Sequence, residues 1–312
     1  MSWRTDLEVA VGGVQLHAMQ RAIAVAAGVK TQRTDDGVAY YVRAGKRGLP
    51  LVCVHGFGGD KETWLVMSAL MTRARGIAMI DLPGHGASAD VLESVRPRTE
   101  AEASIRHHAE AVLRVMDRAG IDRAVVCGNS MGGGVTLRLA ASYPDRVAGM
   151  VLVASIGRDV HDGGARAWID GENPLIPREE DVDKFMDIVM ERPPPVGKAV
   201  IRHVIMQRVK RAVQLHRLFR GFILASSDTD GVPRAIGGID RPALVIHGEQ
   251  DRIIDKSVAL DLVAGLPRAE LVVMRGVGHG PQLEAPRATA KIIERFAERV
   301  EHDERLRIRL AR

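Results

Sequence analysis

One short stretch constrains the fold of this chain more than any other. The apolar run Val125-Val126-Cys127 leads into Gly128-Asn129-Ser130-Met131-Gly132, and a segment compatible with a helix follows at once. An apolar run of this length predicts a strand, so the pattern marks an abrupt strand-to-helix turn. Glycine is needed two residues before and after the serine, because a Cβ at either position would collide with neighbouring backbone. The stretch predicts a fold of alternating strands and helices, with the Ser130 hydroxyl pointing out of the turn.

A serine at such a turn is a candidate nucleophile, and the chain supplies partners in the required order. Serine is a poor nucleophile until a base removes its proton. Asp251 follows an expected strand at 243–246, and His279 follows another at 271–274. Because the carboxyl ends of strands in open α/β sheets gather at one edge, these side chains are expected to meet there. We assign Ser130 as nucleophile, His279 as general base and acid, and Asp251 as the group that orients the imidazole.

Alternatives exist for each of these three residues. Glu249 and Asp255 share the loop of Asp251, and either could be the acid instead. The chain has 11 histidines, so an arbitrary one is an ordinary surface or core residue. His279 stands out because glycines flank it in a loop that directly follows a strand. Ser130 could be an ordinary turn serine, but the flanking strand and helix argue against that interpretation.

An acyl-transfer site also needs backbone donors for an oxyanion. The N–H of Met131, at the start of the helix, is one expected donor. The expected strand 51–54 runs into His55-Gly56-Phe57-Gly58-Gly59, and the N–H of Phe57 is the second expected donor. These glycines match neither a dinucleotide fingerprint nor a P-loop, which disfavours a phosphate cradle. His55 is expected to pack and to shape the loop rather than to react.

Five motifs together resemble the α/β-hydrolase superfamily over most of residues 38–300. They are, in chain order, His55–Gly59, Asp81–Ser88, Gly128–Gly133, His247–Asp251 and Gly278-His279. The first motif, continued by Asp60-Lys61 and Trp64, and an insertion of lid length resemble the monoacylglycerol-lipase-like and bacterial lipase or esterase branch. The resemblance implies a serine hydrolase that acts on small-molecule or lipid carboxylic esters. Hydrolysis by a triad requires no cofactor, and no metal-ligand cluster is apparent.

The order of the expected elements indicates an α/β fold with a mostly parallel sheet covered on both faces. The expected strands are 39–43, 51–54, 77–80, 124–127, 150–153, 243–246 and 271–274, and the expected core helices are 61–73, 100–119, 131–142, 256–264 and 287–300. A chain of 312 residues suits one domain with an insertion. We divide it into an N-terminal amphipathic segment, 1–37, a hydrolase core, 38–155 and 240–312, and an inserted helical cap, 156–239.

The cap is bounded by glycines, Gly163-Gly164 near its start and Gly237-Gly238 near its end. Helices are expected within it at 179–190, 196–210 and 214–226, with a rigid corner at Pro193-Pro194-Pro195. Three cap residues, Met186, Met190 and Met206, are expected to line an acyl pocket, because methionine adapts to irregular apolar shapes. The alternative is that these methionines pack the cap onto the core, and one residue can do both.

The N-terminal segment has several interpretations. Leu16, Met19, Ile23 and Ala26 share one helical face, and Gly28 is a plausible stop. The apolar run 22–27 is too short to span a bilayer. The helix could dock on the enzyme, on a partner subunit or on a membrane surface.

Composition narrows the partners and the location. The net charge is +5, and basic runs such as Arg208, Lys210 and Arg211 could attract anionic lipid or acidic substrates. With 4% aromatic residues and no basic-aromatic platform, nucleic-acid binding is not expected. Cys53 and Cys127 are expected as buried, reduced thiols in neighbouring strands. Two such thiols form no disulfide framework, which favours a cytoplasmic location, with peripheral membrane contact as an option.

The predicted triad leaves three functions open. Ester hydrolysis is preferred, but the same groups can transfer an acyl chain to another acceptor or cleave a carbon–carbon bond beside a ketone. A non-catalytic binding protein with this fold is the third option. An intact triad with two oxyanion loops argues against it, because binding alone needs no activated serine.

Overall fold

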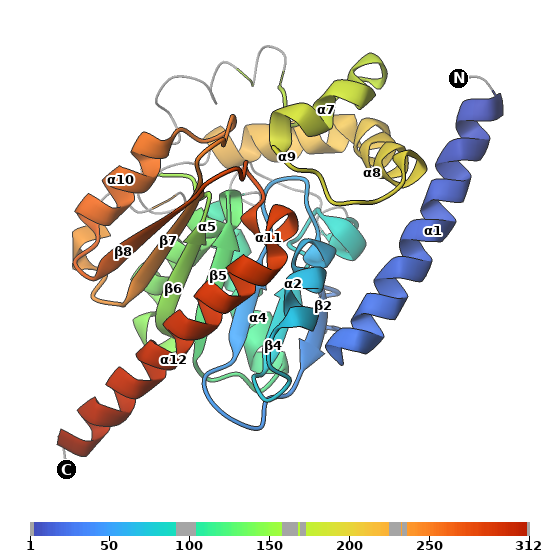
Figure 1. Ribbon diagram of the computed structural model, residues 1–312. Helices are drawn as coiled ribbons and strands as arrows, with labels where there is room; N and C mark the ends of the chain where they lie inside the picture. The colour runs from blue at the N-terminus through green and yellow to red at the C-terminus, as the bar shows by residue number, and fades with distance from the viewer. Residues whose placement is uncertain are drawn as a thin grey trace.

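The computed structural model describes residues 3–91, 104–157, 168, 173–224, 232 and 236–310. Eight strands form one sheet in the order β1-β2-β4-β3-β5-β6-β7-β8 (Figure 1). β2 pairs antiparallel with both β1 and β4, and the remaining pairs are parallel. The predicted α/β class with a mostly parallel sheet is confirmed.

The strands agree closely with the expected ones. They are β1 Lys30–Arg33, β2 Ala39–Arg43, β3 Leu51–Val54, β4 Ile77–Ile80, β5 Ala124–Asn129, β6 Val147–Val153, β7 Ala243–Gly248 and β8 Ala269–Met274. Every residue of β3 to β7 is buried, which explains their continuous apolar sequences. β1 was not expected. It is an edge strand whose residues, Lys-Thr-Gln-Arg, are all polar and exposed, so it lacks the apolar pattern of a strand.

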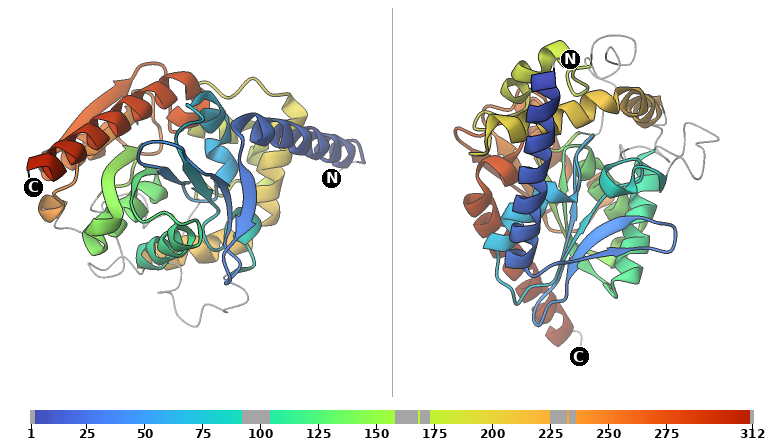
Figure 2. Two further views of the ribbon diagram at one scale, coloured as in Figure 1. Left: turned by 90° about the horizontal axis from the view of Figure 1, so that it is seen from below. Right: turned by 90° about the vertical axis from the view of Figure 1, so that its right-hand side faces the viewer.

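Helices cover both faces of the sheet (Figure 2). Those of the core are α2 Leu65–Leu70, α4 Ile105–Arg118, α5 Met131–Ser142, α10 Lys256–Gly265, α11 Pro281–Glu284 and α12 Pro286–Leu310, with 3-10 turns at Lys61–Trp64, Gly86–Ser88, Pro144–Arg146 and Ile236–Gly238. Alternate residues of one strand serve opposite faces. Val52 and Val54 join the apolar cluster under α4, α5 and α10, whereas Leu51 and Cys53 join the cluster under α2 and α12. Cys53 lies opposite Cys127 in the sheet, and both are buried free thiols, as expected.

The helices between β6 and β7, which we call the cap, lie over the carboxyl ends of the strands (Figure 1). Its described helices are α7 Val182–Val189, α8 Lys198–Lys210 and α9 Ala212–Leu224, with a 3-10 turn at Glu179–Asp181 before α7. They agree with the three expected cap helices, although the expected end of the last one, Ser226, lies outside the described residues. The proposed boundary at Gly163-Gly164 lies outside them as well.

The N-terminal helix α1, Trp3–Ala27, runs along the outside of the molecule beside α8 (Figure 2). It ends at Gly28, whose φ of +68° is a left-handed conformation that favours glycine, as the sequence predicted. Two glycines allow a close approach to α8: a Cβ on Gly12 would lie 2.0 Å from the Ala199 carbonyl oxygen, and one on Gly13 would lie 2.6 Å from the His203 ring. Among the described helices, none combines the length and apolar character needed to cross a membrane.

Candidate active site

Ser130 occupies a strained turn between β5 and α5. Its φ of 54° and ψ of −118° lie in a region that non-glycine residues rarely adopt, at a cost of about 1–3 kcal/mol. Backbone hydrogen bonds hold this conformation: the Ser130 N–H donates to the Val153 carbonyl, and the Ser130 carbonyl accepts from Gly133 and Ile156. The side chain lies at the start of α5, where the first backbone N–H groups have no partner within the helix.

The structure explains why glycine is needed on both sides of the serine, as the steric argument predicted. A Cβ on Gly128 would lie 2.0 Å from the Gly132 carbonyl oxygen. A Cβ on Gly132 would lie 2.3 Å from the Val54 carbonyl oxygen. Neither contact is tolerable, so the tight turn requires glycine at both positions.

His279 and Asp251 form a buried acid–base pair. The imidazole Nδ1 lies 2.9 Å from Oδ2 of Asp251, and Oδ1 accepts from the backbone N–H groups of Ile253 at 2.8 Å and Ile254 at 3.0 Å. Burial acts to raise the pKa of Asp251, but the hydrogen bond and charge of His279 and the two backbone N–H groups outweigh it, so the pKa is lowered. The carboxylate is therefore charged, fixed in place and directed at the imidazole.

The structure separates Asp251 from the two other acids of its loop. Asp255 caps α10 by accepting the Ser257 N–H at 2.8 Å. Glu249 is exposed. Within the described residues, its carboxylate accepts a hydrogen bond only from the neighbouring Gln250 side chain. Within the described residues, only Asp251 of these three acids bonds to His279, so geometry favours Asp251.

The loop after β3 lies against the nucleophile. A Cβ on Gly56 would lie 3.0 Å from the Ser130 Cβ. The Gly56 carbonyl accepts from the Gly59 N–H at 3.0 Å and lies 2.7 Å from Nδ1 of His55. In a trans peptide the carbonyl and the following N–H point in opposite directions, so anchoring this carbonyl also fixes the direction of the Phe57 N–H.

His55 has a defined tautomer in this arrangement. Its Nε2 accepts the Leu82 N–H at 3.0 Å, so the proton resides on Nδ1 and is donated to Gly56. Burial lowers the pKa of His55, which keeps the ring neutral. The expectation that His55 shapes the loop agrees with these bonds.

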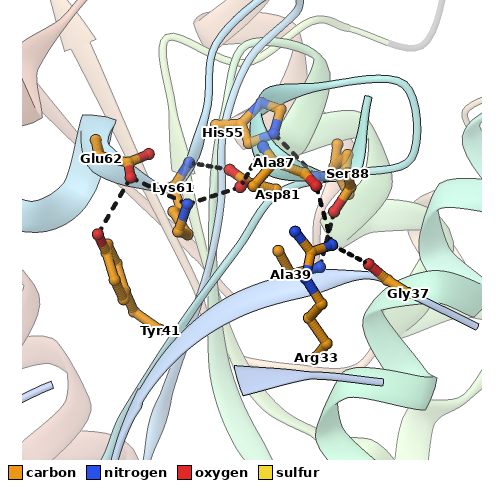
Figure 3. A network of polar contacts seen from close by, with 11 residues as sticks. Arg33, Gly37, Ala39, Tyr41, His55, Lys61, Glu62, Asp81, Ala87 and Ser88 are labelled. Atoms are coloured by element: carbon orange, nitrogen blue, oxygen red, sulfur yellow. Dashed lines mark hydrogen bonds and ion pairs between the residues drawn. The ribbon is translucent and has the colours of Figure 1, made fainter. Parts of the chain in front are cut away.

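A polar network beneath this loop joins it to the loop after β4 (Figure 3). Asp81 accepts the Lys61 N–H at 2.7 Å, the Lys61 ammonium at 2.8 Å and the Ala87 N–H at 2.9 Å. Lys61 also lies 3.0 Å from Glu62, which accepts the hydroxyl of Tyr41. Burial acts to lower the pKa of Lys61, but Asp81 and Glu62 raise it, so the cation is retained.

His55 is the first of three buried histidines whose rings lie in a row. The rings of His55 and His85 lie 5.1 Å apart, and those of His85 and His108 lie 6.0 Å apart. Burial lowers the pKa of each of the three, for His108 to about 3. All three rings are therefore neutral at ordinary pH. His108 lies within helix α4, and no sequence pattern singles it out.

Two further polar side chains lie beside the pair, and both belong to sequence motifs in which no role was assigned to them. Nδ2 of Asn129 donates to the carbonyl of Val153 at 3.0 Å and to that of His279 at 3.3 Å, so it joins the serine turn to the histidine loop. His247 is buried, and its Nε2 lies 3.9 Å from Oδ2 of Asp251. Burial lowers the pKa of His247, against the influence of Asp251.

The three cap methionines lie in different surroundings. Met206 is buried in a small cluster with Val9 of α1 and Phe185 of α7, and Met186 packs against it. Met190 lies beside the histidine loop, because its Cε is 3.6 Å from the place of a Cβ on Gly280. Met190 is therefore the one of the three that directly neighbours the candidate site. Among the described residues, no group of three or more His, Cys, Asp or Glu side chains could hold a metal ion.

Comparison with known proteins decides the family. The model of the alpha/beta hydrolase family matches residues 51–292, which include Ser130, Asp251 and His279. The chain belongs to the α/β-hydrolase family. This α/β hydrolase also resembles a solved structure described as a membrane phospholipase A, with a TM-score of 0.79 and 27% identity over 93% of this chain and 92% of the other.

The curated relatives of this α/β hydrolase have different activities. It is 31% identical to the dihydrolipoyllysine-residue acetyltransferase component of the acetoin cleaving system of Pseudomonas putida, over 83% of this chain and 67% of that protein. It is 30% identical to lipase 1 of Psychrobacter immobilis, over 85% and 82%. It is 29% identical to a 2-hydroxymuconate semialdehyde hydrolase of Pseudomonas sp. strain CF600, over 87% and 92%. These three relatives are named for different reactions.

Proposed function

We propose that this α/β hydrolase cleaves carboxylic esters through an acyl intermediate on Ser130. The observation that carries the proposal is the 2.9 Å contact between His279 and a buried Asp251, in a molecule that also holds Ser130 in a strained turn. Such a pair keeps one imidazole nitrogen protonated and the other free to accept a proton. Lipase relatives support an ester as the substrate.

In the first half-reaction, Nε2 of His279 accepts the Ser130 proton while the hydroxyl oxygen attacks the ester carbonyl. The carbonyl oxygen becomes an oxyanion, for which the N–H groups of Phe57 and Met131 are the proposed donors. His279 then gives its proton to the alcohol oxygen as the carbon–oxygen bond breaks. Asp251 stabilises the imidazolium that exists between these two transfers.

In the second half-reaction, His279 removes a proton from water, and the resulting hydroxide attacks the acyl carbon. The same donors hold the second oxyanion. When it collapses, the bond to Ser130 breaks, the serine oxygen regains its proton from His279, and the carboxylic acid leaves. No cofactor is required for either step.

We further propose a lipid ester as the substrate class, with contact to an anionic lipid surface through α1 and α8. The outward face of α1 carries Leu7, Val11, Val14 and Val25, of which the last two are 73% and 78% exposed. Exposed apolar stripes of this kind support contact with an apolar surface. The neighbouring helix α8 contains Lys and Arg but no Asp or Glu, which favours anionic headgroups. Co-sedimentation with anionic vesicles should be lost in Val14→Glu.

A panel of p-nitrophenyl esters from two to sixteen carbons tests the proposed reaction. We expect turnover with an optimum at one chain length, and loss of several decades in kcat for Ser130→Ala. A vinylogous 1,5-diketone and an alternative acyl acceptor are assayed beside the esters. Faster turnover of the diketone would contradict the proposal in favour of carbon–carbon cleavage. Predominant transfer of the acyl group to the acceptor would contradict it in favour of acyl transfer.

A further inference from the structure

Several polar contacts join the cap to the core, and two of them lie on the proposed catalytic machinery. One is on the loop that carries His279. The other is on the loop that carries Phe57. The two side chains that make these contacts, Glu284 and Arg208, take no part in the proposed proton transfers.

The first contact is made by Glu284 of α11. Its carboxylate accepts four backbone N–H groups: Gly278 at 2.9 Å and Gly280 at 3.0 Å, on either side of His279, and Glu191 and Arg192 of the cap, each at 2.9 Å. The cap also accepts a bond from this loop: the His279 N–H donates to the Val189 carbonyl at 3.1 Å. A charged acceptor that holds several N–H groups makes stronger bonds than a neutral one. The backbone around His279 is thus fixed to the end of α7.

The second contact is made by Arg208 of α8. Its guanidinium donates to the carbonyl oxygens of Gly58 at 2.7 Å, Phe57 at 3.4 Å and Leu175 at 2.8 Å. Burial lowers the pKa of Arg208 to about 10, so the cation persists at neutral pH. A planar guanidinium can reach several oxygens at once in a fixed geometry, which a lysine ammonium does not reproduce. Arg208 thus fixes the loop that carries the Phe57 N–H to the cap, and His55 fixes the same loop to the core.

We propose that Glu284 and Arg208 are positioning residues that make the active geometry of this α/β hydrolase depend on the docked cap. The inference rests on the proposed function, since it assigns these residues to the alignment of His279 and Phe57. In the docked cap, Glu284 aligns the general base and Arg208 aligns an oxyanion donor. Undocking would break the bonds of Glu284 to residues 191 and 192, the bond from His279 to Val189 and the bonds of Arg208 together, so substrate turnover and cap docking are coupled.

Steady-state kinetics of Glu284→Gln and Arg208→Lys test this dependence. Glu284→Gln keeps the shape of the side chain but removes its charge, and Arg208→Lys keeps the charge but removes the planar guanidinium that reaches several oxygens at once. We expect kcat to fall about 10–100-fold, as misplacement of a reacting group or an oxyanion donor does, while KM stays within about threefold. Glu298→Gln and Arg217→Lys are the matched controls, because both residues are exposed on helices of the core and cap, and native kinetics are expected from both.

Hydrogen exchange provides the second readout. In Arg208→Lys we expect faster exchange at 189–192 and 278–280 as well as at 57–59, because the cap docks as a unit. A merely local packing role would change exchange only beside residue 208. Thermal melting of each variant verifies that it is folded.

The outcomes separate this inference from the proposed function. Absence of ester turnover and of Ser130 labelling by a fluorophosphonate in the native protein would reject the proposed function. With an active native protein, unchanged kcat in both variants would overturn the inference. So would a loss confined to KM, or faster exchange confined to the neighbourhood of the substituted residue.

Discussion

At the scale of single residues, the site depends on how Asp251 is held. Its Oδ2 faces His279, while its Oδ1 accepts two backbone N–H groups at the start of the next turn. These bonds leave the carboxylate only one orientation. The same bonds keep the proton of His279 on Nδ1, which frees Nε2 to act as the base.

Asp251→Asn should therefore reverse the tautomer of His279. An amide at this position presents an N–H to the imidazole, so Nδ1 becomes the acceptor and Nε2 holds the proton. We expect kcat to fall about 10³–10⁴-fold with little change in the free energy of unfolding. Asp255→Asn is the matched control, because Asp255 only caps a helix. If Asp251→Asn stays near native activity while the control is inactive, the acid has been assigned to the wrong residue.

At the scale of elements, α1 braces the cap helix that carries Arg208. The two helices approach closely at Gly12 and Gly13, the Arg202 guanidinium pairs with Glu8 at 3.2 Å, and the His203 ring bonds to the Val9 carbonyl at 2.8 Å. Close packing of this kind tolerates little added volume. The position of α8, and with it the reach of Arg208, depends on α1.

Gly12→Ala should loosen this contact. The added Cβ meets the backbone of Ala199 at 2.0 Å, and backbone cannot rotate away as a flexible side chain can. We expect the free energy of unfolding in a denaturant titration to fall by about 1–3 kcal/mol. Gly197→Ala, where the Cβ meets open space, should change it by no more than about 0.5 kcal/mol. Equal effects in the two variants would contradict the close α1–α8 contact.

The elements also show what the sequence could predict. The buried strands and the positions of Ser130, Asp251 and His279 were predictable, because apolar runs and the loops that follow them are local patterns. β1 was not, because an exposed edge strand of polar residues has no such pattern. Glu284 and Arg208 were not either. Their partners are backbone groups as far as 93 and 151 positions away in the chain, which no local pattern reveals.

At the scale of the whole molecule, the buried row His55, His85 and His108 couples stability to pH. Their folded pKa values are lowered by burial, whereas in the unfolded chain each has an ordinary value near 6.5. Below that pH the unfolded chain binds protons that the folded protein does not. The unfolded state is therefore favoured as the pH falls, and the stability is recovered above the unfolded pKa.

His108→Leu should weaken this acid sensitivity. Each neutral buried histidine contributes about 1.4 kcal/mol of lost stability per pH unit below about 6.5. The pKa of His108 is about 3, so this contribution should persist throughout a titration from pH 6 to pH 5. We expect the free energy of unfolding, measured by denaturant titration, to fall less steeply between these two pH values in the variant. The difference in slope should correspond to the uptake of about one proton. An identical slope in both proteins would mean that His108 does not stay neutral in the folded state.

The central claim is that Ser130 is an activated nucleophile, and the most direct measurement is covalent labelling by a fluorophosphonate. The native protein and Ser130→Ala are incubated with the reagent, and the adduct is located by mass spectrometry of peptides. We predict one phosphonyl adduct on Ser130 in the native protein, formed within minutes, and none in the variant. An unlabelled native protein, or an adduct that persists in Ser130→Ala, would contradict the account.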